Sequence, residues 1–192
     1  MIEMLECPPD SLYRDDELEV RMLVLSDAPS LFEAVRASRT EIGEWESWCT
    51  PEYQLEHSFA YLLTSAAHRS AKLDYDYGLI DRASGKVIGF VAINQINRVH
   101  QFANLGYWVH SDYTGRGLAG KAARALARFG FAELGLFRLE IVVELGNSRS
   151  RRVAEKLGAK LEGVGRWRLN YRGEPCDAWL FSLLPGEVAE PT

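Results

Sequence analysis

Cysteine and histidine are scarce in this sequence, and neither is spaced as a metal site requires. The three cysteines, Cys7, Cys49 and Cys176, are far apart and form no CxxC pair, and only four histidines are present. Structural zinc sites need closely spaced Cys and His ligands, and disulfide frameworks usually have an even number of cysteines. The composition therefore predicts a reduced, cytoplasmic protein without a metal.

Long apolar runs and an excess of basic residues are also missing. No uninterrupted apolar run approaches the roughly 18 residues that cross a bilayer, and the first residues lack a basic region followed by an apolar one. Lysine and arginine total 22 against 27 aspartates and glutamates, which gives a net charge of -5. We therefore expect neither a membrane protein nor a secreted one, and no direct binding to nucleic acid.

The 192 residues, of which 47% are hydrophobic, suffice for one domain with a sizeable core. Residues 1–16 contain Pro8 and Pro9 and show no period, so they are predicted to form an N-terminal arm. The domain is expected to span residues 17–185, and residues 186–192 to form a C-terminal tail.

Hydrophobic periodicity predicts an α+β fold with a mixed, mostly antiparallel central sheet flanked by helices. Helical spacing of apolar residues is found at about residues 27–35, 51–68, 118–132 and 147–157. Alternation and β-forming residues predict strands at 18–22, 75–80, 87–95, 102–109, 138–143, 160–169 and 176–183.

A glycine-rich turn separates the predicted strand 102–109 from the next helix. Its sequence, Gly115-Arg116-Gly117-Leu118-Ala119-Gly120, brings free backbone N–H groups and the positive end of a helix dipole together, as anion sites do. A Walker A loop would need a hydroxyl after Lys121, where the chain has Ala122. The residues also match the GxGxxG pattern of dinucleotide-binding folds, but in such folds this pattern follows the first strand, whereas here it comes late in the chain. The pyrophosphate of coenzyme A, or glycines present for packing alone, are the other interpretations.

Several further motifs accompany this turn, and together they resemble the GNAT acetyltransferases, in particular the RimJ/RimL branch. Thr114 to Ala119 matches the family's R/Q-x-x-G-x-G/A pattern except at its first position. The other motifs are Ile42-Gly43-Glu44-Trp45-Glu46-Ser47-Trp48, Leu105-Gly106-Tyr107-Trp108-Val109, Asn147-Ser148-Arg149-Ser150, Lys156-Leu157-Gly158-Ala159 and Leu161-Glu162-Gly163. The resemblance extends from Leu18 to Leu184.

The resemblance implies acetyl-CoA as the cosubstrate and suggests the residues that hold it. Backbone N–H groups of the turn would bind the pyrophosphate, and the edge of the preceding strand would pair with pantetheine. Asn147 would contact pantetheine, act as a plain helix cap, or do both. The residues so implied are Trp108, Val109, Arg116, Gly117, Leu118, Ala119, Gly120, Lys121 and Asn147.

Two residues are implied as chemical groups. Ala154 stands where many relatives carry a Tyr that acts as the general acid, and Asn104 stands where many carry a Glu that acts as the general base. Ser150 is then the candidate that hydrogen-bonds the leaving thiolate, and Glu162 is the candidate base. The alternatives are a helix-surface serine, a solvated glutamate and a water chain in place of the base.

The implied acceptor is a primary amine, with a protein N-terminal α-amine as the first hypothesis. An α-amine has a pKa of about 8 against about 10.4 for lysine, so it needs less help to lose its proton. Trp45, Trp48 and Tyr171 are the candidate acceptor-binding residues, although tryptophans more often pack in a core. A polyamine or aminoglycoside acceptor, and a non-catalytic CoA-binding module, are the alternatives. Homodimers are common in the family, so a second copy of the chain is an expected partner.

Overall fold

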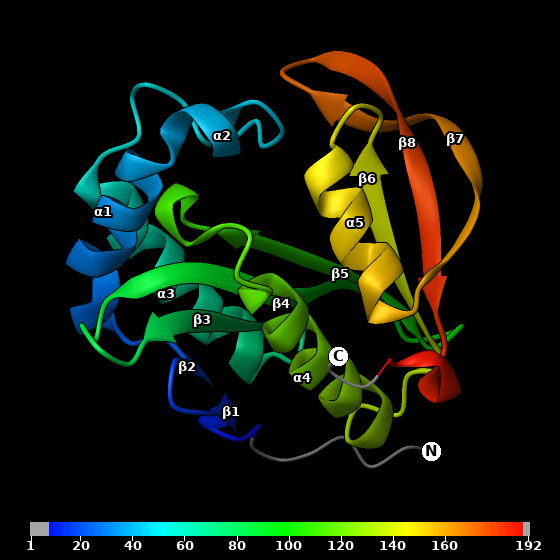
Figure 1. Cartoon of the computed structure of the whole chain (residues 1–192), viewed down its shortest axis with the longest axis horizontal. Coiled ribbons are helices and arrows are strands. Elements are labelled where there is room, and N and C mark those ends of the chain that lie inside the picture. The colour runs from blue at the N-terminus through cyan, green and yellow to red at the C-terminus, as the bar shows by residue number, and fades with distance from the viewer. Residues whose placement is uncertain (1–7, 190–192) are drawn as a thin grey trace.

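The computed structural model describes residues 8–189 and contains one eight-stranded sheet (Figure 1). The spatial order of the strands is β1-β2-β3-β4-β5-β6-β8-β7. Their bounds are Ser11–Arg14 (β1), Leu18–Arg21 (β2), Tyr75–Asp81 (β3), Val87–Asn97 (β4), Phe102–Val109 (β5), Arg138–Glu144 (β6), Lys160–Tyr171 (β7) and Glu174–Leu183 (β8).

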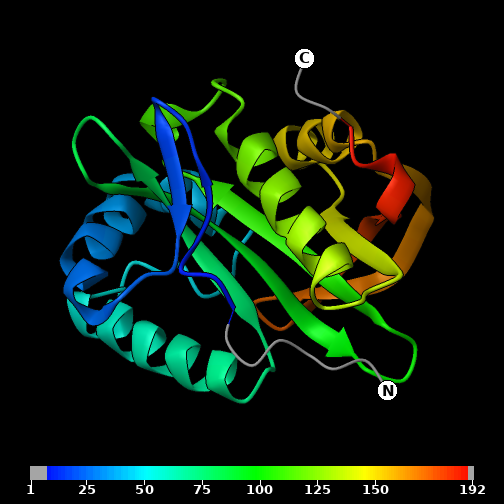
Figure 2. The same cartoon turned by 90° about the horizontal axis from the view of Figure 1, so that it is seen from below.

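Helices cover both faces of this sheet (Figure 2). The α-helices are Ala28–Ala37 (α1), Arg39–Gly43 (α2), Leu55–Ser70 (α3), Leu118–Ala132 (α4) and Ser148–Leu157 (α5). Short 3-10 turns occur at Leu25–Asp27, Ser111–Tyr113 and Pro185–Glu187. Helices α1 and α3 pack together on one face, whereas α4 and α5 pack together on the other. In the part of the chain that the structure describes, no helix has the length and apolar character needed to cross a bilayer.

Two hydrophobic cores hold these layers together. The larger core joins α4 to the sheet, and α4 fits closely because four of its seven buried positions are alanine or glycine. Gly130 lets the helix approach β4, since an added Cβ there would lie 2.7 Å from the Cδ1 atom of Ile93. The smaller core packs α1 and α3 on the opposite face around Leu31, Val35 and Leu62. Burial on both faces explains why every residue of β3 is buried.

Every neighbouring pair of strands is antiparallel except one, which confirms the predicted mixed, mostly antiparallel sheet. Strand β5 runs parallel to β6 and pairs with it only from Phe102 to Asn104, opposite Arg138 to Glu140. Past these residues the two strands separate, while β5 keeps its pairing with β4 and β6 keeps its pairing with β8. The sheet therefore splits into a V that opens toward Val109 and Glu144.

Two elements were not predicted from the sequence. Strand β1 lies inside the segment for which an irregular arm was expected, and it pairs with β2. Its Leu12 and Tyr13 pack against the larger core, which gives this four-residue strand its place despite the lack of a period. Helix α2 is only five residues long and has a single buried residue, Ile42, so it carried no periodic signal.

Candidate active site

The open end of the V lies between two helix N-termini. Strand β5 leads through residues 110–117 into α4, and β6 leads through residues 145–147 into α5. Beyond Asn104, the edge of β5 that faces β6 has no strand partner. Of the two residues expected to pair with an extended ligand, Val109 presents its backbone groups to this edge, whereas the alternation of the antiparallel pairing directs those of Trp108 toward Phe90 of β4. Unpaired edge groups can accept hydrogen bonds from, or donate them to, an added chain.

The glycine-rich loop before α4 presents free backbone amides, as predicted. The N–H groups of residues 115–120 donate to no acceptor in the described part of the chain. Gly115 and Gly117 have φ angles of +80° and +75°, a left-handed conformation that glycine adopts without strain. An added Cβ at either position would meet no protein atom within 4 Å, so the space above these amides is open. The loop therefore has the geometry of an anion cradle.

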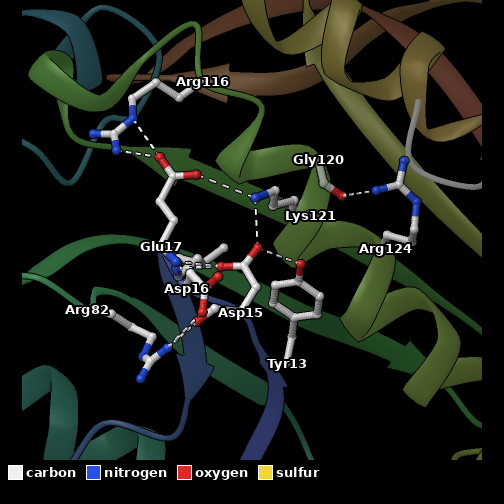
Figure 3. Close-up of polar contacts among 10 residues, drawn as sticks. Tyr13, Asp15, Asp16, Glu17, Arg82, Arg116, Gly120, Lys121 and Arg124 are labelled. Carbon is white, nitrogen blue, oxygen red and sulfur yellow. Dashed lines mark hydrogen bonds and ion pairs between the residues drawn. The ribbon is translucent and has the colours of Figure 1, made fainter.

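Lys121 differs from the other residues predicted for this loop. Its amide already donates to the carbonyl oxygen of Gly117 at 3.1 Å, so only its side chain could contact a bound anion. Lys121 Nζ instead contacts Asp15 Oδ2 at 2.7 Å and Glu17 Oε2 at 3.4 Å (Figure 3). The guanidinium of Arg116 also binds Glu17 (Figure 3). Both cations at this loop are thus paired with carboxylates of the β1–β2 turn.

Asn147 caps α5, which confirms one of its two predicted roles. Its Oδ1 atom accepts a hydrogen bond from the amide of Ser150 at 3.0 Å. The cap leaves the Asn147 Nδ2 group available to a ligand at the open end of the V. At the other end of α5, Gly158 has φ +99° and terminates the helix, as a C-terminal glycine does.

Ser150 contacts a tyrosine that the sequence analysis did not single out. Tyr107 in β5 donates its hydroxyl hydrogen to the Ser150 carbonyl oxygen at 2.9 Å, and Ser150 Oγ lies 3.4 Å from the Tyr107 hydroxyl. Burial raises the pKa of Tyr107, so it stays protonated at neutral pH. Ala154, at the position where relatives carry a Tyr, is fully buried. The described hydroxyl groups in this region are therefore paired across the V, from β5 to α5.

Glu162, the predicted base, lies at the closed end of the V. Its two carboxylate oxygens accept hydrogen bonds from Arg138 Nη1 and Nη2, each at 2.6 Å. Arg138 also binds Glu140 Oε1 at 3.0 Å. The hydrogen bonds from Arg138 lower the pKa of Glu162 to about 2. A carboxylate with this pKa accepts a proton poorly at neutral pH, which counts against the predicted role.

A different carboxylate faces the open end. Glu46 follows Trp45, whose ring would lie 3.4 Å from a Cβ added to Gly146, next to the α5 cap. The Glu46 side chain is exposed, yet desolvation by the surrounding protein raises the pKa of its carboxylate. Repulsion from Glu144 raises this pKa further, while a 3.1 Å hydrogen bond from Trp48 Nε1 opposes the shift. Sequence reasoning placed Glu46 beside the acceptor tryptophans but not as the base, because the desolvation of a carboxylate leaves no local pattern.

The predicted acceptor residues are found around the same opening. Trp45 and Trp48 lie in the turns that follow α2, and Trp48 is 43% exposed, so it is not a core residue. Tyr171, near the tip of the β7–β8 hairpin, donates a hydrogen bond to the carbonyl oxygen of Gly43 at the end of α2. The hairpin and the α2 segment therefore meet above the open end of the V. Within residues 8–189, no group of three or more potential ligand side chains is placed to bind a metal.

A model of the family described as "Acetyltransferase (GNAT) domain" matches residues 17–160. The chain belongs to the GNAT acetyltransferase family. Among its GNAT relatives is YdaF of Bacillus subtilis (strain 168), provisionally named a ribosomal N-acetyltransferase. It is 27% identical over 174 residues, which cover 90% of this chain and 94% of YdaF.

Solved GNAT structures share the whole architecture. One is a Vibrio cholerae protein provisionally named a ribosomal-protein-serine acetyltransferase. It is 29% identical with a TM-score of 0.82, over 93% of this chain and 99% of the other. Another is the microcin C7 self-immunity acetyltransferase MccE, solved in complex with acetyl-CoA and AMP. It is 20% identical with a TM-score of 0.83, over 93% of this chain and 98% of MccE. The MccE comparison concerns the fold alone.

Proposed function

We propose that this chain is an acetyl-CoA-dependent N-acetyltransferase whose acceptor is a protein N-terminal α-amine. The observation that carries the proposal is the run of free amides at residues 115–120, set beside the open edge of β5 in a GNAT fold. Free amides at a helix start bind phosphate groups, and an open strand edge binds an extended amide chain.

The residues present fit acetyl-CoA. The amides of Arg116, Gly117, Leu118, Ala119 and Gly120 would hold its pyrophosphate, and the open space above Gly115 and Gly117 leaves room for it. The β5 edge at Val109 and the Nδ2 group of Asn147 would hold the pantetheine. Bound acetyl-CoA supplies an acetyl thioester, the activated group that acyl transfer needs.

Ser150 is the residue that we propose to stabilise the leaving sulfur. Its amide is fixed by Asn147 and its carbonyl by Tyr107, so the Ser150 hydroxyl has a defined position at the open end of the V. Because the Tyr107 hydroxyl keeps its proton, it serves as a hydrogen-bond partner behind Ser150 and positions it. A fixed hydroxyl can hold a proton where negative charge develops.

For the base we propose Glu46 in place of Glu162. Glu162 lies at the closed end of the V, where Arg138 neutralises it, whereas desolvation and Glu144 raise the pKa of Glu46 between the predicted acceptor residues Trp45 and Trp48. A carboxylate with a raised pKa is the better proton acceptor near neutral pH. An α-amine with a pKa of about 8 needs only this modest assistance.

The acceptor assignment rests on the relatives and on the surroundings of the opening. YdaF and the Vibrio cholerae protein both have names that refer to ribosomal proteins. Trp45, Trp48 and Tyr171 surround the opening and offer aromatic surface to a short peptide. We also expect the enzyme to act in the cytoplasm and as a homodimer; Cys49 and Cys176 are free thiols, which suits a reducing compartment.

Calorimetric titration of the purified chain with coenzyme A tests the cofactor assignment. We expect a dissociation constant in the micromolar range and a rise in melting temperature, because a ligand of the native state stabilises it. Gly117→Val should weaken binding about tenfold or more, since a side chain would fill the cradle. Gly85→Val is the matched control: Gly85 has φ +70° and open space like Gly117, but it lies in the β3–β4 turn.

An acceptor panel tests the rest of the proposal. Peptides with free N-termini, polyamines and aminoglycosides are each incubated with acetyl-CoA and analysed by mass spectrometry. We expect the peptides to be acetylated at the α-amine. Faster acetylation of a polyamine or aminoglycoside would replace the proposed acceptor class, and binding of coenzyme A without any acetylation would indicate a non-catalytic module.

A further inference from the structure

The cradle at the start of α4 combines free amides with cations that are already neutralised. Arg116 donates to Glu17 through Nε at 2.9 Å and through Nη2, and its guanidinium lies 5.1 Å from the centre of the Tyr113 ring. Lys121 Nζ lies between the carboxylates of Asp15 and Glu17 (Figure 3). The two side chains that would attract phosphate are therefore held by anions of the chain itself.

The two carboxylates are held in different ways. Asp15 accepts four hydrogen bonds, from the amides of Glu17 and Leu18, from the Tyr13 hydroxyl and from Lys121. It therefore belongs to the structure of the β1–β2 turn. Among the described residues, the Glu17 side chain contacts only Arg116 and Lys121, and it is 36% exposed. Glu17 can thus leave its cations by a change of side-chain rotamer, whereas Asp15 cannot without breaking the turn.

We infer that the Glu17 carboxylate is a built-in competitor of phosphate at this cradle, and that it sets the affinity for coenzyme A. The inference rests on the proposed function, because it assumes that coenzyme A binds at residues 115–120. Arg116 favours bidentate contacts with anionic oxygens, whether they belong to a carboxylate or to a phosphate. A phosphate bound at the amides can contact the guanidinium of Arg116 only if Glu17 moves away. If Glu17 stays, its carboxylate repels the phosphate.

Physical chemistry gives this competition a definite sign. Glu17→Gln removes one negative charge beside the cradle and frees Arg116, so coenzyme A should bind more tightly, by about fivefold at low ionic strength. Salt screens charges near the surface, so the advantage should shrink toward none at about 0.5 M salt. If Glu17 instead held Arg116 in position for phosphate, the same substitution would weaken binding.

The neighbouring residue provides a matched control. Asp16 lies in the same turn and is fully exposed, and its one ion pair with another described residue is the 4.0 Å approach to Arg82. Asp16→Asn changes the net charge of the chain as Glu17→Gln does, but it touches neither Arg116 nor Lys121. A specific competition predicts tighter binding for the Glu17 variant alone, whereas a general charge effect would tighten both.

The experiment is calorimetric titration of wild type, Glu17→Gln, Asp16→Asn, Arg116→Gln and the double variant Glu17→Gln/Arg116→Gln with coenzyme A and with 3′-dephospho-CoA. We expect tighter binding by Glu17→Gln with both ligands, since both contain the pyrophosphate, and loss of this gain in the double variant. Melting temperatures of the unliganded variants confirm that each is folded.

The outcomes separate the two proposals. Wild-type protein that fails to bind coenzyme A would refute the proposed function. Wild-type binding with unchanged or weaker affinity for Glu17→Gln would refute the inference alone. A gain that vanishes with 3′-dephospho-CoA would also refute it, because the competition would then concern the 3′-phosphate instead of the cradle.

Discussion

The closed and open ends of the V each hold a glutamate, and the two glutamates are in opposite electrostatic environments. At the closed end, Glu162 meets the guanidinium of Arg138 through both oxygens, and its pKa is lowered to about 2. At the open end, Glu46 is desolvated and lies near Glu144, and its pKa is raised. The same type of side chain therefore has a lowered pKa at the closed end and a raised pKa at the open end, and a raised pKa favours the role of proton acceptor that we propose for Glu46.

This difference shows that the environment of a carboxylate, and not the motif in which it stands, sets the direction of its pKa shift. Glu162 belongs to a sequence pattern of the RimJ/RimL branch, whereas Glu46 lies between two tryptophans of another pattern and carried no assigned role. A carboxylate whose two oxygens both bind a guanidinium stays ionised and mainly supports the structure. A desolvated carboxylate has a raised pKa and accepts a proton more readily.

The largest effect is expected at Glu46. Glu46→Gln should lower kcat by about 10²-fold near neutral pH, because the amide cannot accept the proton of the amine, while the dissociation constant of coenzyme A stays the same. The loss should shrink at high pH, where the amine deprotonates unaided. Glu162→Gln is the comparison and should change kcat by about twofold or less; a large loss there and none at Glu46 would reverse the two roles.

Next in size is the hydroxyl pair at the open end. Ser150→Ala should lower kcat about tenfold, since water can partly replace the hydroxyl at the leaving sulfur. Tyr107→Phe should lower kcat by a smaller factor, because Tyr107 acts through Ser150. Steady-state kinetics and titration with coenzyme A check both variants. Equal losses in kcat and in cofactor affinity would assign the pair to binding instead.

A smaller effect on stability should appear at the closed end. The pKa of Glu162 is lower in the folded protein than its ordinary value of 4.5, so its ion pair contributes stability above that pH. This contribution is lost as the pH falls toward 2. At pH 7, Glu162→Gln should therefore lower the melting temperature by about 2 °C, a modest change because the pair is partly exposed. Thermal melts from pH 7 to pH 3 should show the difference narrowing; a constant difference would contradict the ion-pair explanation.

The smallest effect concerns the pH profile. Trp48→Phe removes the hydrogen bond that lowers the pKa of Glu46, so the acid limb of kcat/KM should move to higher pH. Glu144→Gln removes the repulsion that raises this pKa, so the limb should move to lower pH. Shifts in opposite directions would identify Glu46 as the titrating group, and identical profiles would exclude it.

Much of the fold could be predicted because the signals for it are local. Capping of α5 by Asn147 and the free backbone amides of the glycine-rich turn follow from residues adjacent in the chain, and the structure confirms both of them. The strands and long helices also carry their own periodicity. The short elements β1 and α2 escaped prediction, since four or five residues do not establish a period.

The site was less predictable because its chemistry depends on contacts between distant segments. Arg138 and Glu162 are 24 residues apart, Tyr107 and Ser150 are 43 apart, and Arg116 and Glu17 are 99 apart. No spacing rule connects such pairs, so the sequence could suggest Ser150 and Glu162 by resemblance but could not show which partners they have.

The short parallel pairing of β5 with β6 has a mechanical consequence. Only three residues of each strand join the β1–β5 half of the sheet to the β6–β8 half, so this seam is short compared with the β4–β5 and β6–β8 pairings on either side of it. A ligand lying along the free edge of β5 would act as an added strand and brace the two halves. Amide hydrogen exchange near the seam should then slow when ligand is bound, while the continuous β3–β4 pairing stays unchanged. A ligand bound along β5 would then be part of the sheet and would make the protein more rigid.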